Sequence, residues 1–137
     1  MPRIPSRRKD NKSIVDRIGI GKSGEEEAVE FLKRKGYKIL ERNYRLPNFG
    51  EIDIIAKDKD VICFVEVKTR TGTSYGEPYE AVTKNKQFKL SMLALSYLKE
   101  KNLMQKRARF DIISISNAEI RLFINAFDLS ARFTYWE

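Results

Sequence analysis

Two strand-like runs lie four residues apart near the middle of the chain, and this spacing restricts the possible folds more than any other feature. The runs are "GEIDIIA" (50–56) and "VICFVEVKTR" (61–70), with "KDKD" (57–60) between them. A connection this short joins antiparallel neighbours. The β-branched and aromatic residues of the second run are typical of a strand that is buried on both faces. We therefore expect a sheet with helices packed against it.

Capping signals and hydrophobic periodicity predict the remaining elements. Ser23 and Glu26 have the spacing of a capping box, and Gly36 is the expected end of that first helix. A second helix is expected over about residues 80–101, where apolar residues recur at helical spacing. Further strands are predicted at 37–46, 108–116 and 119–127, and residues 71–79 read as a loop. The order α-β-β-β-α-β-β predicts an α/β fold with a mixed sheet flanked by helices.

The composition excludes several kinds of chemistry. The chain has no histidine and one cysteine, Cys63. Catalysis by Ser-His-Asp or Cys-His groups and His-ligated zinc sites are therefore impossible. Any metal ion would have to be a hard cation held by carboxylates. No apolar run approaches the roughly 20 residues of a membrane span, so we expect a cytoplasmic protein with no membrane partner.

The charge distribution points to a partner that carries phosphates. The net charge is +8, and the basic residues are dense in residues 1–18, which contain little apolar surface. We predict a basic, disordered tail over residues 1–18 and a single domain over 19–137. The tail is either a solvated terminus or an arm that contacts phosphates. A net positive charge of this size is typical of proteins that bind nucleic acid.

Acidic side chains meet on the two central strands. Glu51 and Asp53 share one face of their strand, and Glu66 and Lys68 share one face of the next, because residues two apart project to the same side. The sequence does not fix the register, but it places these groups in one neighbourhood. A surface ion-pair cluster is one interpretation. The apolar residues around the charges favour a divalent cation such as Mg²⁺, which would relieve the repulsion between carboxylates.

The motifs "GEID" (50–53) and "FVEVKTR" (64–70) resemble the PD-(D/E)xK nuclease motif, with Asp53 followed by Glu66-x-Lys68. Together with "GEEEAVEFL" (24–32) and "RFDII" (109–113), they are similar to the bacterial YraN-like family of predicted endonucleases. The same layout resembles archaeal Holliday junction resolvases. The resemblance implies a restriction-endonuclease-like fold, and Ile52 stands where the motif's name has Pro.

By this resemblance, Asp53 and Glu66 would be metal ligands together with the backbone carbonyl of Val67. Lys68 would activate the attacking water or stabilise the charge that develops at phosphorus. Glu25, in the first helix, would complete the site or help to hold a second metal ion.

Four further residues are weaker candidates. Glu51 is expected to lie just outside the direct metal ligands. Lys86 and Gln87, early in the long helix, and Arg70 would contact phosphate or position water. For Lys86 and Gln87, a solvated helix face is an equal alternative.

The resulting hypothesis is an endonuclease that depends on Mg²⁺ or Mn²⁺ and hydrolyses phosphodiester bonds in DNA, including branched or single-stranded DNA. The alternatives are a nucleic-acid-binding module that keeps the fold without cutting, and a nuclease directed at RNA. The resemblance to resolvases also implies a homodimer, because a two-fold dimer cuts a four-way junction symmetrically.

Overall fold

The computed structural model describes residues 23–70, 82–116 and 119–128. The predicted tail (1–18) and the loop at 71–79 lie outside these residues. The elements follow the predicted order and the fold class is confirmed: α2 (Ser23–Arg34), β1 (Lys38–Leu46), β2 (Gly50–Asp58), β3 (Val61–Arg70), α3 (Lys84–Glu100), β4 (Ala108–Ser116) and β5 (Glu119–Phe127).

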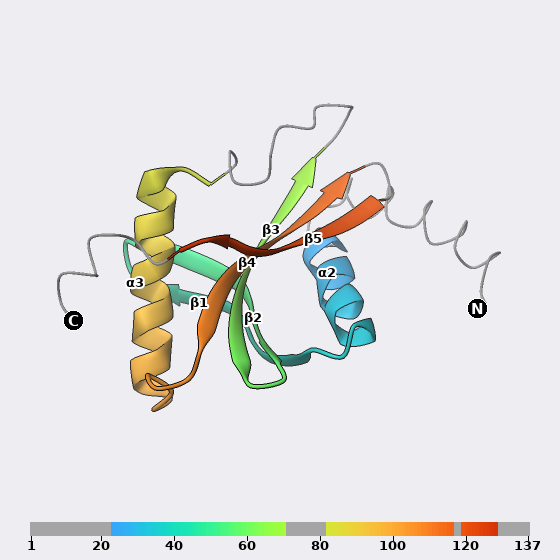
Figure 1. Cartoon of the computed structure of the whole chain (residues 1–137). Coiled ribbons are helices and arrows are strands. Elements are labelled where there is room, and N and C mark those ends of the chain that lie inside the picture. Colours follow the sequence, from blue (N-terminus) through green and yellow to red (C-terminus); the bar gives the residue numbers. More distant parts are fainter. Residues whose placement is uncertain (1–22, 71–81, 117–118, 129–137) are drawn as a thin grey trace.

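The strands form one five-stranded sheet in the order β1-β2-β3-β4-β5. Neighbouring strands are antiparallel except β3 and β4, which are parallel. A parallel pair needs a crossover connection, and α3 lies within that connection. Helix α3 lies on one face of the sheet and α2 on the other (Figure 1).

Local signals determine where both helices begin or end. After α2, Gly36 has φ of +93°, and the N–H of Tyr37 donates to the carbonyl of Leu32 at 3.0 Å, as in a glycine-terminated helix. Helix α3 begins at Lys84 rather than at residue 80, because the Thr83 side chain caps it by accepting the N–H of Lys86 at 3.1 Å. Residues 80–81 lie outside the described residues. Neither described helix is long and apolar enough to cross a membrane.

Each helix buries its own side of the sheet, which explains the apolar character of the central strands. Residues buried on the α3 side include Ile52, Ile55, Ile62, Phe64, Leu93, Tyr97 and Ile112. Residues buried on the α2 side include Ala28, Leu32, Ile54, Ala56, Cys63, Val65 and Ile113. The Cys63 thiol is buried, and burial raises its pKa to about 12, so it stays protonated at neutral pH.

A buried ionic network joins β2, β4 and β5, away from the predicted site residues Asp53 and Glu66. The guanidinium of Arg109 donates to Asp111 at 3.0 Å, to Asp58 at 3.2 Å and to the Tyr37 hydroxyl at 2.8 Å. The Asp111 side chain has no exposed surface and also accepts the N–H of Asn125 at 2.8 Å. Every partner of this carboxylate is therefore a donor, as a buried acid requires.

Candidate functional site

The site begins where the ladder between β2 and β3 ends. The last paired residues are Ile54 and Val65, and one more step of that register places Asp53 opposite Glu66. The ladder does not continue with that step. Instead, Oδ2 of Asp53 accepts the N–H of Val67 at 2.8 Å. The side chain of Asp53 thus takes a backbone donor of β3 and is held against that strand.

The strand alternation changes at Asp53. Ile52 and Ile55 are buried on the α3 side, whereas Ile54 is buried on the α2 side, although residues 52 and 54 should share a face. On β1, Asn43 lies between the paired positions that flank Asp53, and it has φ of +53°. Irregularities of this kind often redirect side chains beside functional sites. Here the irregularity directs Asp53 toward α2.

Three carboxylates converge at this point. One carboxylate oxygen from each of Glu25 on α2 and Glu51 and Asp53 on β2 lies within 4.8 Å of the other two. Asn43 orients Glu25 by donating to its Oε1 at 3.1 Å, and Arg45 forms an ion pair with Glu51. Within residues 23–70, 82–116 and 119–128, these three form the one group whose acidic oxygens could jointly hold a metal ion.

A close approach of helix and strand places Glu25 in this group. A Cβ atom added at Gly24 would lie 2.5 Å from Cγ2 of Thr69, near the end of β3. Glycine therefore allows the first turn of α2 to lie directly against the end of β3. This contact places the carboxylate of the next residue, Glu25, in the site.

Burial and like charge make Asp53 difficult to ionise. The residue is 9% exposed, and its pKa is raised to about 7, first by burial and then by the charge of Glu66. Glu25 and Glu51 raise the pKa further, while the N–H of Val67 lowers it. A divalent cation would offset the cost of ionising Asp53 in this place, and an all-oxygen donor set suits Mg²⁺ or Mn²⁺. The residues present therefore fit a hard divalent ion.

Glu66 lies on the other side of the sheet end. It is 6% exposed and forms an ion pair with Lys86 of α3, with Oε2 and Nζ 2.5 Å apart. Lys68 follows on the same face of β3 and is partly exposed. Among the described residues, no ion pair involves Lys68. The structure thus brings Asp53 together with Glu25 and Glu51, and it joins Glu66 to a lysine of the long helix.

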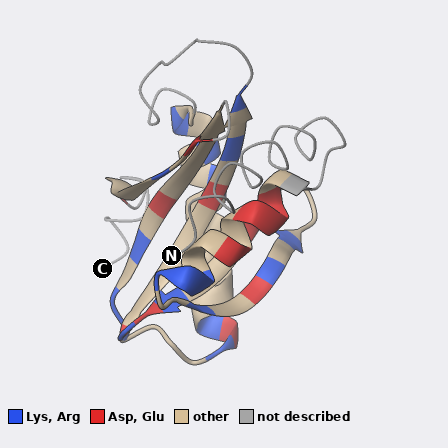
Figure 2. Cartoon of the chain, turned by 90° about the vertical axis from the view of Figure 1, so that its right-hand side faces the viewer, with Lys and Arg blue, Asp and Glu red and all other residues tan. Residues whose placement is uncertain are grey.

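The remaining sequence candidates lie around this centre. The carbonyl proposed as a ligand belongs to Val67, the residue whose N–H holds Asp53. At the start of α3, the side-chain amide of Gln87 donates to the carbonyl of Val82 at 3.1 Å. Arg70 ends β3, and blue segments gather where β3 ends and α3 begins (Figure 2).

Sequence reasoning missed two residues that shape the site. Asn43 was not considered, although an asparagine inside a strand is a signal for positive φ. Gly24 was read only as part of a motif, and its close contact with Thr69 has no sequence signature. Glu51 was expected just outside the ligands, whereas its oxygens lie within the carboxylate group.

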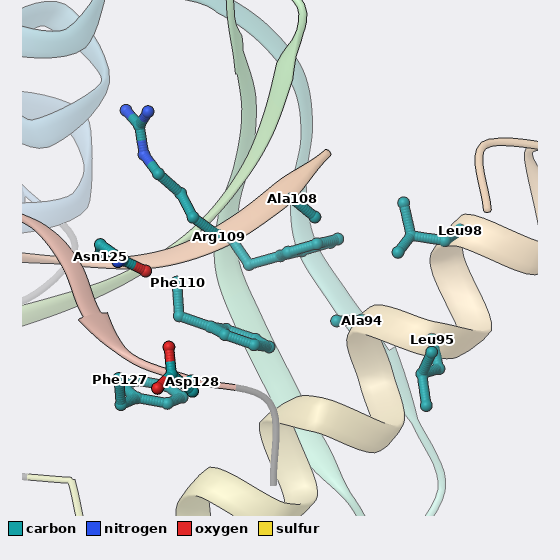
Figure 3. A pocket seen from close by; sticks show the side chains of 10 residues that line it. Ala94, Leu95, Leu98, Ala108, Arg109, Phe110, Asn125, Phe127 and Asp128 are labelled. Carbon is teal, nitrogen blue, oxygen red and sulfur yellow. The ribbon is translucent and has the colours of Figure 1, made fainter. Parts of the chain in front are cut away.

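A separate hollow of about 170 Å³ lies between α3 and the strands β4 and β5 (Figure 3). Its walls are mostly apolar, including Leu95, Leu98, Phe110 and Phe127. The guanidinium of Arg109 extends away from it (Figure 3), toward the buried network described above. None of the acidic candidates lines this hollow, so it is distinct from the carboxylate group.

Comparison with known proteins identifies the family. The model described as "Uncharacterised protein family UPF0102" matches residues 24–115. The chain belongs to the UPF0102 family. A UPF0102 protein of Desulfosudis oleivorans is 50% identical over 110 residues, which cover 79% of this chain and 89% of that protein. The UPF0102 protein of Persephonella marina is 50% identical over 109 residues, covering 80% and 93%.

A third UPF0102 relative, from Syntrophus aciditrophicus, is 47% identical over 121 residues, which cover 85% of this chain and 94% of the relative. These matches confirm the resemblance to the YraN-like family of predicted endonucleases that the sequence motifs indicated. The relatives' names specify no activity.

Proposed function

We propose that this protein is a nuclease that uses Mg²⁺ or Mn²⁺ to hydrolyse phosphodiester bonds in DNA. One observation carries the proposal: three carboxylates converge, and one of them is the buried Asp53, whose pKa is raised to about 7, beside a strand that carries Glu66 and Lys68. Asp53 has no ion pair among the described residues, and a buried charge without a partner lowers the stability of a fold. Groups with strongly shifted pKa values of this kind are concentrated at functional sites. A binding-only module would have no need of such a group.

Glu25, Glu51 and Asp53 would hold the cation, with Glu66 close by. A bound divalent ion supplies positive charge for a phosphate oxygen and lowers the pKa of water. Arg45 and Asn43 keep two of these carboxylates in place, and the N–H of Val67 fixes the third.

Lys68 would act on the scissile phosphate. Lys68 is partly exposed, two residues after Glu66 on the same face of β3. Its compact ammonium would stabilise the negative charge that grows on the phosphate oxygens. In the reaction, the oxygen of a water molecule bonds to phosphorus while the bond from phosphorus to one ester oxygen breaks. One proton of that water is released, and the departing oxygen takes up a proton. The products are an alcohol and a phosphate monoester.

A polar row across the sheet offers a path for the substrate backbone. Lys68 on β3 pairs with Ser114 on β4, which pairs with Arg121 on β5, so the three share one face. Two strand spacings separate Lys68 from Arg121, about 10 Å, which matches the rise of about three nucleotides in duplex DNA. Arg121 is exposed and its guanidinium lies 5.0 Å from the ring centre of Phe123, so the charge is available to a phosphate.

A cleavage panel tests the proposal. Duplex, single-stranded, flap and four-way DNA, together with RNA, would be incubated with Mg²⁺, with Mn²⁺ or with EDTA. We expect cutting of DNA only with metal, and its loss in Asp53→Asn but not in Glu30→Gln, a control that removes an exposed carboxylate of α2. If the protein binds these substrates but cuts none of them, it is a non-catalytic binding module. If it cuts RNA alone, its substrate is RNA and not DNA.

A further inference from the structure

The ion pair between Lys86 and Glu66 joins two groups that differ sharply in their exposure. The Glu66 side chain is 7% exposed, whereas the Lys86 side chain is 40% exposed. In an ion pair that is buried at both ends, removing either partner is strongly destabilising, because the other charge is left buried without compensation. Here the cation reaches in from solvent and can leave without opening the core.

The position of Lys86 in its helix is also unfavourable in itself. Helix N-termini carry a partial positive charge and favour acidic residues in the first turn. The first turn of α3 contains no acidic residue and carries Lys84 and Lys86 instead. A local preference broken in this way is typical of functional sites. The start of α3 is therefore built to meet an anion, and in the structure that anion is Glu66.

Glu66 is consequently absent from the carboxylate group that faces α2. The oxygens of Glu25, Glu51 and Asp53 lie together, while an oxygen of Glu66 is taken by an ammonium. Asp53 and Glu66 nevertheless directly follow the last paired residues of β2 and β3, and Oδ2 of Asp53 accepts the N–H of Val67, the neighbour of Glu66. The charge of Glu66 is also the second largest cause of the raised pKa of Asp53. Glu66 is thus adjacent in β3 to the residue that holds Asp53, while its carboxylate is paired with Lys86.

We propose that Lys86 and a divalent cation compete for the carboxylate of Glu66. Resting on the proposed function, this inference means that Lys86 serves as the counter-cation of Glu66 in the metal-free protein. Glu66 becomes a metal ligand only when Lys86 withdraws, and the released ammonium then faces the surface where the substrate phosphates would lie. Lys86 is thus a positioning residue that sets how tightly the site takes up metal.

Calorimetric titration with Mn²⁺ alone, without nucleic acid, tests the competition. We expect Lys86→Met to bind Mn²⁺ on the order of tenfold more tightly than the wild type, because the ion no longer has to displace the Lys86 ammonium from Glu66. A tenfold change corresponds to about 1.4 kcal/mol, a size typical of a hydrogen bond to a charged group. Lys89→Met is the matched control, since it removes the same charge from the same helix and no described ion pair involves Lys89. Its affinity should differ from the wild type by much less.

A double-mutant cycle separates competition from simple repulsion. In a Glu66→Gln background, Lys86→Met should change Mn²⁺ affinity no more than Lys89→Met does, because the contested carboxylate is gone. A tenfold gain that persists in that background would overturn the inference. So would a Lys86→Met protein whose affinity equals that of the wild type or of Lys89→Met.

A second variant keeps the test decisive if Lys86→Met does not fold without metal. Lys86→Arg retains the charge and can hold a carboxylate with two parallel hydrogen bonds. We expect it to bind Mn²⁺ several-fold more weakly than the wild type, and binding as tight as the wild type would overturn the competition. A wild-type protein that binds no Mn²⁺ would overturn the proposed metal site and this inference with it. A wild type that binds while the variants match it overturns the inference alone.

Discussion

Replacing Asp53 with asparagine should stabilise the metal-free protein, which is an unusual expectation for a buried, hydrogen-bonded residue. Asparagine keeps an oxygen that can accept the N–H of Val67, so the one described hydrogen bond of this side chain can persist. What the substitution removes is the ionisation of a carboxyl group whose pKa is raised from 3.8 to about 7. The remaining carboxylates then face a neutral neighbour.

The direction of the pH dependence follows from proton binding. Between pH 4 and pH 7, the folded protein keeps a proton on Asp53 that the unfolded chain has lost. The contribution of Asp53 to stability is therefore fully present below the unfolded pKa of 3.8, and it is lost as the pH rises through the folded pKa of about 7. With about 1.4 kcal/mol for each unit of pKa, the advantage of Asp53→Asn should grow by about 3 kcal/mol from pH 5 to pH 8.

Urea unfolding in EDTA at several pH values between 5 and 8 measures this difference. Glu30→Gln is the control, because it removes an exposed carboxylate from α2 and should follow the wild type. Saturating Mn²⁺ should reverse the order, since the ion stabilises only the protein that binds it. An Asp53→Asn protein that is less stable than the wild type at pH 8, or a difference that does not change with pH, would refute the reasoning.

Four other substitutions test separate parts of the structure. Lys68→Met should fold and bind metal, yet cut DNA on the order of a hundredfold more slowly, and an unchanged cleavage rate would exclude Lys68 from the reaction. Arg109→Met should lower the free energy of unfolding by about 3–5 kcal/mol, since it leaves a buried carboxylate without its cation; thermal and urea unfolding would show whether it does. Gly24→Ala should weaken Mn²⁺ binding by displacing the start of α2, and adding Thr69→Ala, which removes the clashing methyl group, should restore it. Arg121→Ala should reduce the slope of log affinity against log salt by about 0.9 on duplex DNA, and an unchanged slope would remove Arg121 from the substrate path.

The strands could be predicted closely because their signals are local. Alternation and short turns gave β3, β4 and β5 the bounds that the structure shows. The register between β2 and β3 was not predictable, since a shift by one residue leaves the hydrophobic pattern of a doubly buried strand nearly unchanged. Whether Asp53 faces Glu66 therefore had to come from the structure.

The site was less predictable than the fold because its geometry depends on contacts between distant segments. The sequence singled out Asp53, Glu66 and Lys86, but it did not pair the last two, which are 20 residues apart. The irregularity at Asn43 that directs Asp53 toward α2 also leaves no hydrophobic pattern to read. The division into a tail and one domain, the DNA partner and the homodimer remain predictions, and light scattering with and without DNA would test the last.

The single parallel pairing in the sheet has a consequence for the order of folding. Strands β1, β2 and β3 form a meander of sequence neighbours, and β4 and β5 form a hairpin. Among the ladders of the sheet, the parallel one between β3 and β4 joins these two parts, and it requires closure across the whole α3 connection. Contacts between distant segments are the slow step in small domains. We expect pulse-labelled amides of β1–β3 to gain protection from exchange before those of β4, so that the segment bearing Glu25, Asp53 and Glu66 acquires its strands before Lys86 arrives.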